Sequence, residues 1–166
     1  MESDAIEKAY RMYAGEAYLY SLSLCGNREM AEDIVSEAFV KALLSQTAKE
    51  ENFKLWLLKV CKTTWIDTLR RDRFISEKPL DEYIDLQSQE DVFSTLEHKE
   101  MRDILAAAML KLPAPCREAV TLFYYNRIPQ AEIAQMLGLT NGAVRTLIYR
   151  GRKQLAEELK EAHYEL

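Results

Sequence analysis

Apolar residues along this chain recur at the three- and four-residue steps that place them on one face of a helix. Between residues 31 and 43 this face comprises Ala31, Ile34, Val35, Ala38, Phe39, Ala42 and Leu43. The same spacing predicts a second helix from about Asn52 to Arg71, and a Tyr-rich helix that precedes both and ends near Gly26-Asn27. No run of alternating polar and apolar residues indicates a strand. We therefore predict an all-α protein.

The helix at 52–71 is expected to bury an aromatic-rich face. Its predicted members are Phe53, Trp56, Leu57, Val60, either Trp65 or Ile66, and Leu69. The two tryptophans could instead stack on nucleic-acid bases. For Trp56 we favour core packing because it falls on the apolar side of the helix, and the spacing leaves Trp65 open.

The chain is expected to fold as two small helical domains. Residues 76–93 lack a sustained apolar period and contain Pro79, so they are interpreted as an acidic, flexible linker. Ser94 and Glu97 have the spacing of a capping box, which predicts a helix that ends near Leu112. Pro113-Ala-Pro115 closes that helix and opens the next. The predicted domains are thus residues 1–75 and 94–166.

Charge is distributed unevenly along the sequence. The 166 residues include 22 Lys+Arg and 27 Asp+Glu, a net charge of −5, which argues against non-specific coating of nucleic acid. Residues 53–75 nevertheless carry six basic and two acidic residues, and residues 140–153 carry four basic residues and no acid. The linker carries one basic residue and six acidic ones. Two local basic faces are therefore expected in an otherwise acidic protein.

The composition gives no support to a metal site, a cofactor or catalysis. The three cysteines are scattered singly, and the two histidines lack the spacing of zinc ligands, so buried thiols are expected. No nucleophile, base and metal are arranged as a catalytic centre would need, so we predict no enzyme and no small-molecule substrate. The acidic N-terminus does not resemble a signal peptide, and no apolar stretch approaches 18 residues, so a cytoplasmic location is expected.

Residues 128–155 have the pattern of a helix-turn-helix. Ala134, Gly138 and Val144 stand where such a motif needs a small residue, a turn residue tolerant of positive φ and a branched apolar residue. Thr140 is a suitable N-cap for the second helix. The exposed side of that helix is predicted to carry Asn141, Arg145, Thr146, Tyr149, Arg150, Arg152 and Lys153. We predict duplex DNA binding through this side. The alternative is a helical hairpin with a solvated basic face.

Three stretches, in this order, resemble bacterial RNA polymerase sigma factors of the extracytoplasmic-function group. They are AEDIVSEAFVKAL (31–43), NFKLWLLKVCKTTWIDTLRR (52–71) and LPAPCREAVTLFYYNRIPQAEIAQMLGLTNGAVRTLIYRGRKQL (112–155). The resemblance implies that the first domain, sigma region 2, binds the clamp of core RNA polymerase and the −10 promoter element. It implies that the second, sigma region 4, reads the −35 element as duplex. An anti-sigma protein, often membrane-anchored, is a further partner implied by this group.

The resemblance also assigns individual residues. The implied polymerase contacts are Asp33, Ser36, Glu37 and Val40. The implied −10 contacts are Asn52, Lys54, Lys59, Lys62, Arg70 and Arg71, with a base-reading loop at about 45–52. The implied −35 contacts are Asn141, Gly142, Arg145, Thr146, Arg150, Arg152 and Lys153. Ser36, Thr63 and Leu147 depart from the residues usual in the family.

Two alternatives to an initiation factor remain open at the level of sequence. A stand-alone helix-turn-helix repressor or activator would explain residues 112–155, but not the paired stretches at 31–43 and 52–71. A sigma-like protein that has lost promoter recognition would be compatible with the departures at Ser36, Thr63 and Leu147.

Overall fold

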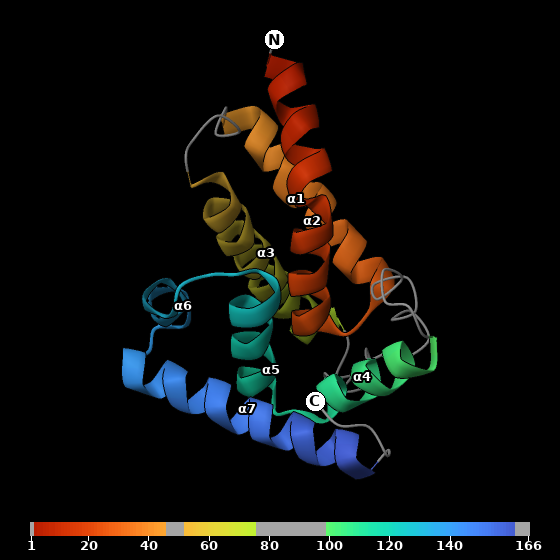
Figure 1. The fold of residues 1–166 in the computed structure, drawn as a ribbon. Coiled ribbons are helices and arrows are strands. Elements are labelled where there is room, and N and C mark those ends of the chain that lie inside the picture. The colour runs from red at the N-terminus through yellow and green to blue at the C-terminus, as the bar shows by residue number, and fades with distance from the viewer. Residues whose placement is uncertain (1, 46–51, 76–98, 162–166) are drawn as a thin grey trace. The chain divides into compact units, whose positions relative to one another are not determined.

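The computed structural model describes residues 2–45, 52–75 and 99–161. Its helices are α1 (Glu2–Cys25), α2 (Arg28–Ser45), α3 (Phe53–Ile75), α4 (Lys99–Lys111), α5 (Ala114–Val120), the π-helical turn η3 (Thr121–Tyr125), α6 (Gln130–Leu137) and α7 (Asn141–Glu161) (Figure 1). Every regular element in these ranges is helical, which confirms the predicted all-α class. The predicted linker, the capping box and most of the loop at 45–52 lie outside the described residues.

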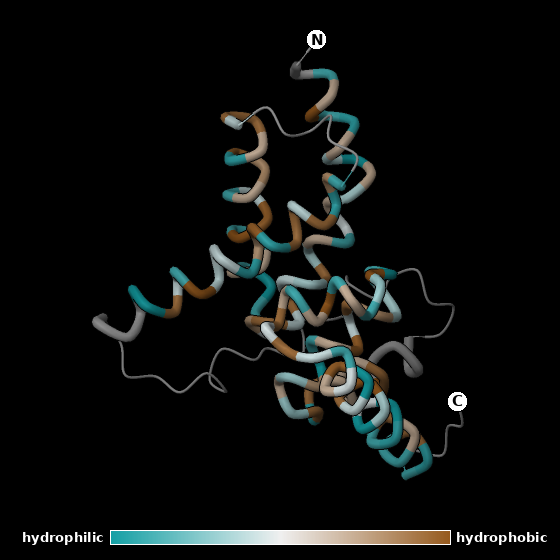
Figure 2. The backbone as a smooth tube through the Cα atoms, turned by 90° about the vertical axis from the view of Figure 1, so that its left-hand side faces the viewer, coloured by the Kyte–Doolittle hydropathy of each residue, from teal (hydrophilic) through white to brown (hydrophobic). Residues whose placement is uncertain are grey.

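The described residues form two compact units, one within residues 1–84 and the other within 85–166. In the first unit, α1, α2 and α3 pack against one another. Hydrophobic and hydrophilic residues are interspersed along each helix (Figure 2), and the apolar residues recur every three or four positions, so each helix buries one side and exposes the other. Aromatic rings tie the helices together: the ring centroids of Tyr10 and Phe39 are 5.0 Å apart, and those of Phe39 and Phe53 are 6.2 Å apart.

The turn between α1 and α2 lies where the sequence predicts it. Gly26 adopts φ 66°, and its N–H donates to the carbonyl of Leu22 at 2.8 Å, which closes α1. The side-chain oxygen of Asn27 then accepts a hydrogen bond from the N–H of Met30 at 2.9 Å and caps α2.

The predicted apolar face of α2 is confirmed except at its C-terminal end. Six of its seven members are buried, but Leu43 is 49% exposed. Each four-residue step advances the side-chain direction by about 40°. The steps from Val35 through Phe39 to Leu43 therefore carry Leu43 past the edge of the buried arc.

In α3 the structure decides between Trp65 and Ile66. Trp65 is 5% exposed and lies on the buried side with Leu58 and Cys61, whereas Ile66 is 37% exposed. Leu58 is fully buried although the sequence pattern did not predict it. Trp56 is only partly buried, and its ring stacks on Phe53 with centroids 5.8 Å apart. Both tryptophans therefore contribute to packing.

In the second unit, α4, α5 and α6 all contact α7. A core cluster combines residues of α4, α5 and α7 with the residue after α4: Ala108, Leu112, Cys116, Val120 and Leu155. Pro113 precedes α5 and Pro115 lies in its first turn, as the sequence predicts. At Gly151 of α7 the neighbouring helix comes very close, since an added Cβ would lie 2.5 Å from Cγ2 of Val120. The packing of α5 on α7 thus requires a residue without a side chain at this position.

This contact predicts opposite effects for two glycine substitutions in α7. Gly151→Ala should lower the free energy of unfolding by about 1–3 kcal/mol, because the new methyl group overpacks the α5–α7 contact. Gly142→Ala should raise it by up to about 1 kcal/mol, because its Cβ meets only Thr140 Oγ1 at 3.9 Å and alanine favours the helix. Urea unfolding followed by circular dichroism measures both. Equal stabilities of the two variants would contradict the close approach at Gly151.

Candidate functional site

The second unit contains the predicted helix-turn-helix. Helix α6 ends at Gly138, which has φ 66°, and the N–H of Leu139 donates to the carbonyl of Ala134 at 2.9 Å. Two residues later the hydroxyl of Thr140 accepts a hydrogen bond from the N–H of Ala143 at 3.1 Å and caps α7. Ile133 and Val144 are fully buried where the two helices meet. Gly138 therefore makes the predicted turn, Thr140 makes the predicted N-cap, and Val144 is the predicted branched residue in the core.

Helix α7 separates its residues cleanly into a buried and an exposed side. Val144, Ile148, Gly151, Leu155 and Leu159 are buried. All predicted −35 contacts are exposed: Asn141, Gly142, Arg145, Thr146, Arg150, Arg152 and Lys153. Tyr149 is exposed as well, to 66%. Because residues 140–153 contain four basic residues and no acid, this side presents a basic surface from Arg145, in the second turn of the helix, to Lys153. Such a surface suits contact with a duplex.

The outward side of α2 changes character along its length. Asp33, Ser36 and Glu37 are exposed in its middle, and Val40 follows them with 54% exposure. Leu44, one turn beyond Val40, is 78% exposed and continues this surface. The acidic residues thus merge into an apolar patch, a combination typical of the centre and rim of a protein–protein interface. Leu44 was not predicted, although its four-residue spacing from Val40 would have indicated it.

Glu37, on the outward side of α2, is ion-paired with a lysine that also contacts the neighbouring helix α3. Lys41 Nζ lies 3.6 Å from a carboxylate oxygen of Glu37 and also donates to the hydroxyl of Thr64 on α3 at 3.2 Å. Thr64 is buried, so it gives the lysine a fixed anchor. The carboxylate of Glu37 is thereby restrained from one side.

The predicted −10 contacts on and just before α3 differ in their exposure to solvent. Asn52, just before the helix, and Lys59, Arg70 and Arg71 are exposed, whereas Lys54 and Lys62 are only partly exposed. Lys54 Nζ lies 3.8 Å from the Glu16 carboxylate of α1, and both side chains are about one-quarter exposed. Much of the charge of Lys54 is therefore balanced within the protein, while Lys59 points to solvent.

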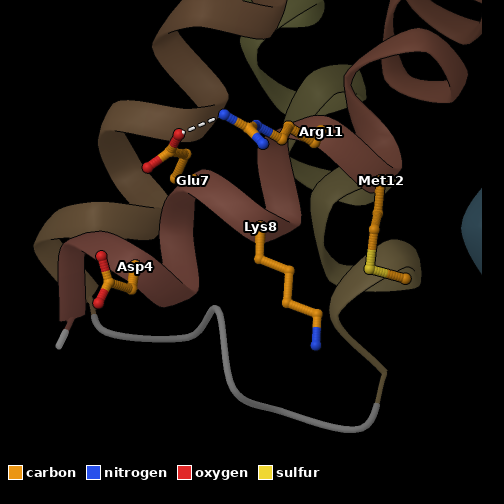
Figure 3. A pocket seen from close by; sticks show the side chains of 5 residues that line it. All are labelled: Asp4, Glu7, Lys8, Arg11 and Met12. Carbon is orange, nitrogen blue, oxygen red and sulfur yellow. Dashed lines mark hydrogen bonds and ion pairs between the residues drawn. The ribbon is translucent and has the colours of Figure 1, made fainter.

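Helix α1 carries an open pocket on its surface. Residues Asp4, Glu7, Lys8, Arg11 and Met12 of α1 line an open surface pocket (Figure 3), in which Arg11 donates to the Glu7 carboxylate at 2.7 Å. Within residues 2–45, 52–75 and 99–161, no cluster of His, Cys, Asp and Glu could hold a metal ion. No helix in these ranges is long and apolar enough to cross a membrane.

The three cysteines are buried free thiols, as expected from the sequence. Cys61 is fully buried in α3, and desolvation raises the pKa of its thiol to about 11. A thiol with this pKa stays protonated and unreactive near neutral pH. Cys61 thus belongs to the core of the first unit.

Comparison with known proteins assigns both units to one family. The model of sigma-70 region 2 matches residues 9–75, and that of sigma-70 region 4 matches residues 102–155. ECF RNA polymerase sigma factor SigM of Bacillus subtilis is 27% identical over 152 residues, which are 90% of this chain and 92% of SigM. SigW of the same organism is 28% identical over 174 residues, covering 96% of this chain and 91% of SigW.

The chain belongs to the extracytoplasmic-function group of sigma-70 factors. A solved structure supports the fold: the sigma factor RpoE of Bartonella quintana, in complex with the anti-sigma factor NepR, aligns with a TM-score of 0.69 at 20% identity. The alignment covers 93% of this chain and 96% of RpoE. The protein is therefore a transcription initiation factor that binds core RNA polymerase and directs it to promoters. A stand-alone helix-turn-helix regulator is not favoured, because the first unit matches region 2.

One departure of this sigma factor from its family has a structural explanation. Leu147 is partly buried and packs against the core cluster of region 4, between the buried residues Val144 and Ile148. It therefore does not share the outward direction of Arg145 and Thr146. Ser36 and Thr63 are both exposed, and nothing in the structure explains why they differ from the usual residues.

Proposed function

We propose that the exposed surfaces of the two units divide promoter recognition between them. The outward side of α2 binds the polymerase clamp, the basic side of α3 contacts the −10 element, and the basic side of α7 reads the −35 element. The observation that carries this division is the exposed side of α7 between residues 141 and 153, which is basic and has no acid. It is combined with the acidic-to-apolar side of α2 in the other unit.

On α2, the proposed polymerase contacts are Asp33, Ser36, Glu37 and Val40. The two carboxylates favour a basic partner surface and steer its approach, while Val40 and the neighbouring Leu44 supply apolar area that becomes buried on binding. Lys41 restrains Glu37, so less side-chain freedom is lost when the complex forms.

On α3, the proposed −10 contacts are Asn52, Lys54, Lys59, Lys62, Arg70 and Arg71. Positive side chains on an exposed helix neutralise phosphates and release counterions. Lys59 contributes more than Lys54, because the Glu16 carboxylate already balances the charge of Lys54.

On α7, the first turn enters the major groove. Asn141 and Arg145 reach base edges, and the absent side chain of Gly142 lets the helix approach the duplex closely. Thr146 lies one turn further along the same side, and its hydroxyl also donates to the carbonyl of Gly142 at 3.0 Å. Arg150, Arg152 and Lys153 contact phosphates, which position the helix.

Region 2 then occupies residues 1–75 and region 4 residues 94–166, joined by the acidic linker at 76–93. The factor acts in the cytoplasm, where it meets the polymerase, and has no catalytic activity, cofactor or small-molecule substrate of its own. An anti-sigma protein is its proposed regulator. The complex of RpoE with NepR, whose sigma factor shares this fold, supports that partner.

Two sets of substitutions should separate polymerase binding from DNA reading. Asp33→Ala with Glu37→Ala should weaken binding to core polymerase about tenfold, equivalent to ~1.4 kcal/mol, because two facing charges are lost. Arg145→Ala should leave core binding unchanged and weaken promoter binding by the holoenzyme by about 1–3 kcal/mol. Titration of labelled core enzyme and of a promoter fragment measures the two affinities.

Matched controls exist on the same helices. Glu32 is an exposed acid of α2 that, like Glu37, is ion-paired along the helix, with Arg28 at 3.4 Å, but it is not among the proposed polymerase contacts. Lys160 is an exposed base at the far end of α7. Glu32→Ala and Lys160→Ala should affect neither affinity by more than twofold. Unchanged core binding by the Asp33/Glu37 double variant would exclude the proposed α2 surface.

The two lysines of α3 predict different salt dependences. Lys59→Ala should reduce the slope of log K against log salt for promoter binding by about 0.7–0.9, the value of one lost phosphate contact. Lys54→Ala should reduce this slope by less, because Lys54 is paired with Glu16. Holoenzyme binding at several salt concentrations measures both slopes, and a larger effect at Lys54 would contradict the assignment.

A further inference from the structure

An aromatic side chain outside the helix-turn-helix faces one of its basic residues. The guanidinium carbon of Arg152 on α7 lies 6.0 Å from the ring centroid of Tyr124, which belongs to η3. Tyr124 is 48% exposed, and its ring meets Phe123 edge-on with centroids 4.9 Å apart at 85°. A guanidinium over the face of a tyrosine ring is attracted by the negative π-electron face. Arg152 is therefore held from a second element.

The π-helical turn places Tyr124 at the surface while Thr121 and Leu122, earlier in the same turn, stay in the core. In this wider turn the N–H of Asn126 donates to the carbonyl of Thr121 at 3.0 Å, five residues back. Thr121 and Leu122 remain buried, whereas Tyr124 and Tyr125 are exposed. Turns of this kind occur frequently at functional sites. The local geometry thus brings an exposed aromatic ring to Arg152 of α7 while Thr121 and Leu122 stay buried.

Arg152 lies on the same side of α7 as Arg145. The two residues are seven positions apart, which is close to two full helical turns. The cation–π contact with Tyr124 is not a hydrogen bond to an acceptor atom, so the N–H groups of the guanidinium remain available to an anion. A side chain held in this way loses less conformational freedom when it binds.

We propose that Tyr124 is a positioning residue in −35 recognition, whose ring holds the Arg152 guanidinium in the direction from which it binds a phosphate of the duplex. This inference rests on the proposed contact between Arg152 and the DNA backbone. Tyr124 itself makes no hydrogen bond to the DNA, so its ring is required and its hydroxyl is not.

A double-mutant cycle with the holoenzyme and a promoter fragment tests the proposal. Tyr124→Leu should weaken promoter binding about two- to fivefold, the effect of one exposed cation–π contact. Tyr124→Phe keeps the ring and should bind like the unaltered protein. Arg152→Gln should weaken promoter binding more than Tyr124→Leu does, and it should reduce the slope of log K against log salt by about 0.9. Adding Tyr124→Leu to Arg152→Gln should then have no additional effect.

Three results would overturn the positioning role. The first is that Tyr124→Leu weakens promoter binding as much in the Arg152→Gln background as in the unaltered protein. The second is that Tyr124→Phe weakens promoter binding as much as Tyr124→Leu does. The third is that Tyr124→Leu weakens binding equally to a fragment without the −35 element. Core polymerase binding and circular dichroism report whether each variant folds. An inert Arg152→Gln would refute both this proposal and the phosphate contact, whereas the response to Arg145→Ala tests −35 reading independently.

Discussion

The burial of one side of α7 determines which of its residues are available to DNA. Val144, Ile148 and Leu155 pack inward, and at Gly151 the approach of Val120 leaves no room for a side chain. Because that side of α7 packs against α5 and α6, the residues exposed to solvent between Asn141 and Lys153 lie on the opposite side. The same packing brings η3 close enough for Tyr124 to face Arg152. The stability of region 4 and its proposed −35 surface therefore both depend on the packing of α7 against its neighbouring helices.

In region 2, too, the burial of one side of a helix determines which residues are exposed on the other. The buried arc of α2 leaves an outward side that begins with carboxylates and ends with Val40, Leu43 and Leu44. Apolar residues exposed in a contiguous patch favour burial by a partner. On α3, by contrast, three of the described exposed positions are basic, namely Lys59, Arg70 and Arg71. Thr64 connects this helix to Lys41 of α2. The proposed polymerase-binding and −10-binding surfaces thus lie on adjacent helices of one small unit.

The sequence predicts the helix-turn-helix well because its key residues have local causes. Gly138 supplies a positive φ, Thr140 supplies a hydroxyl cap, and both effects involve neighbours only a few residues away. The edges of the buried arcs are harder to predict. Whether Leu43 or Ile66 is buried depends on how far the neighbouring helices extend around α2 and α3, which periodicity does not contain.

Contacts between distant residues could not be predicted at all. The pairing of Lys54 with Glu16 and the cation–π contact of Arg152 with Tyr124 join different helices, and no spacing in the sequence indicates them. The π-helical turn at Thr121–Tyr125 likewise has no simple pattern of residues. Arg127 adopts φ 58°, a conformation usually taken by glycine. Because the residue is an arginine, the sequence does not indicate the turn that precedes α6.

Run-off transcription with purified core polymerase and fragmented genomic DNA of the source organism tests the central claim most directly. The account predicts discrete new transcripts only when this protein is added, and their start sites should share two upstream elements, one for each unit. Tight binding to duplex DNA without polymerase, together with no new transcripts, would contradict it.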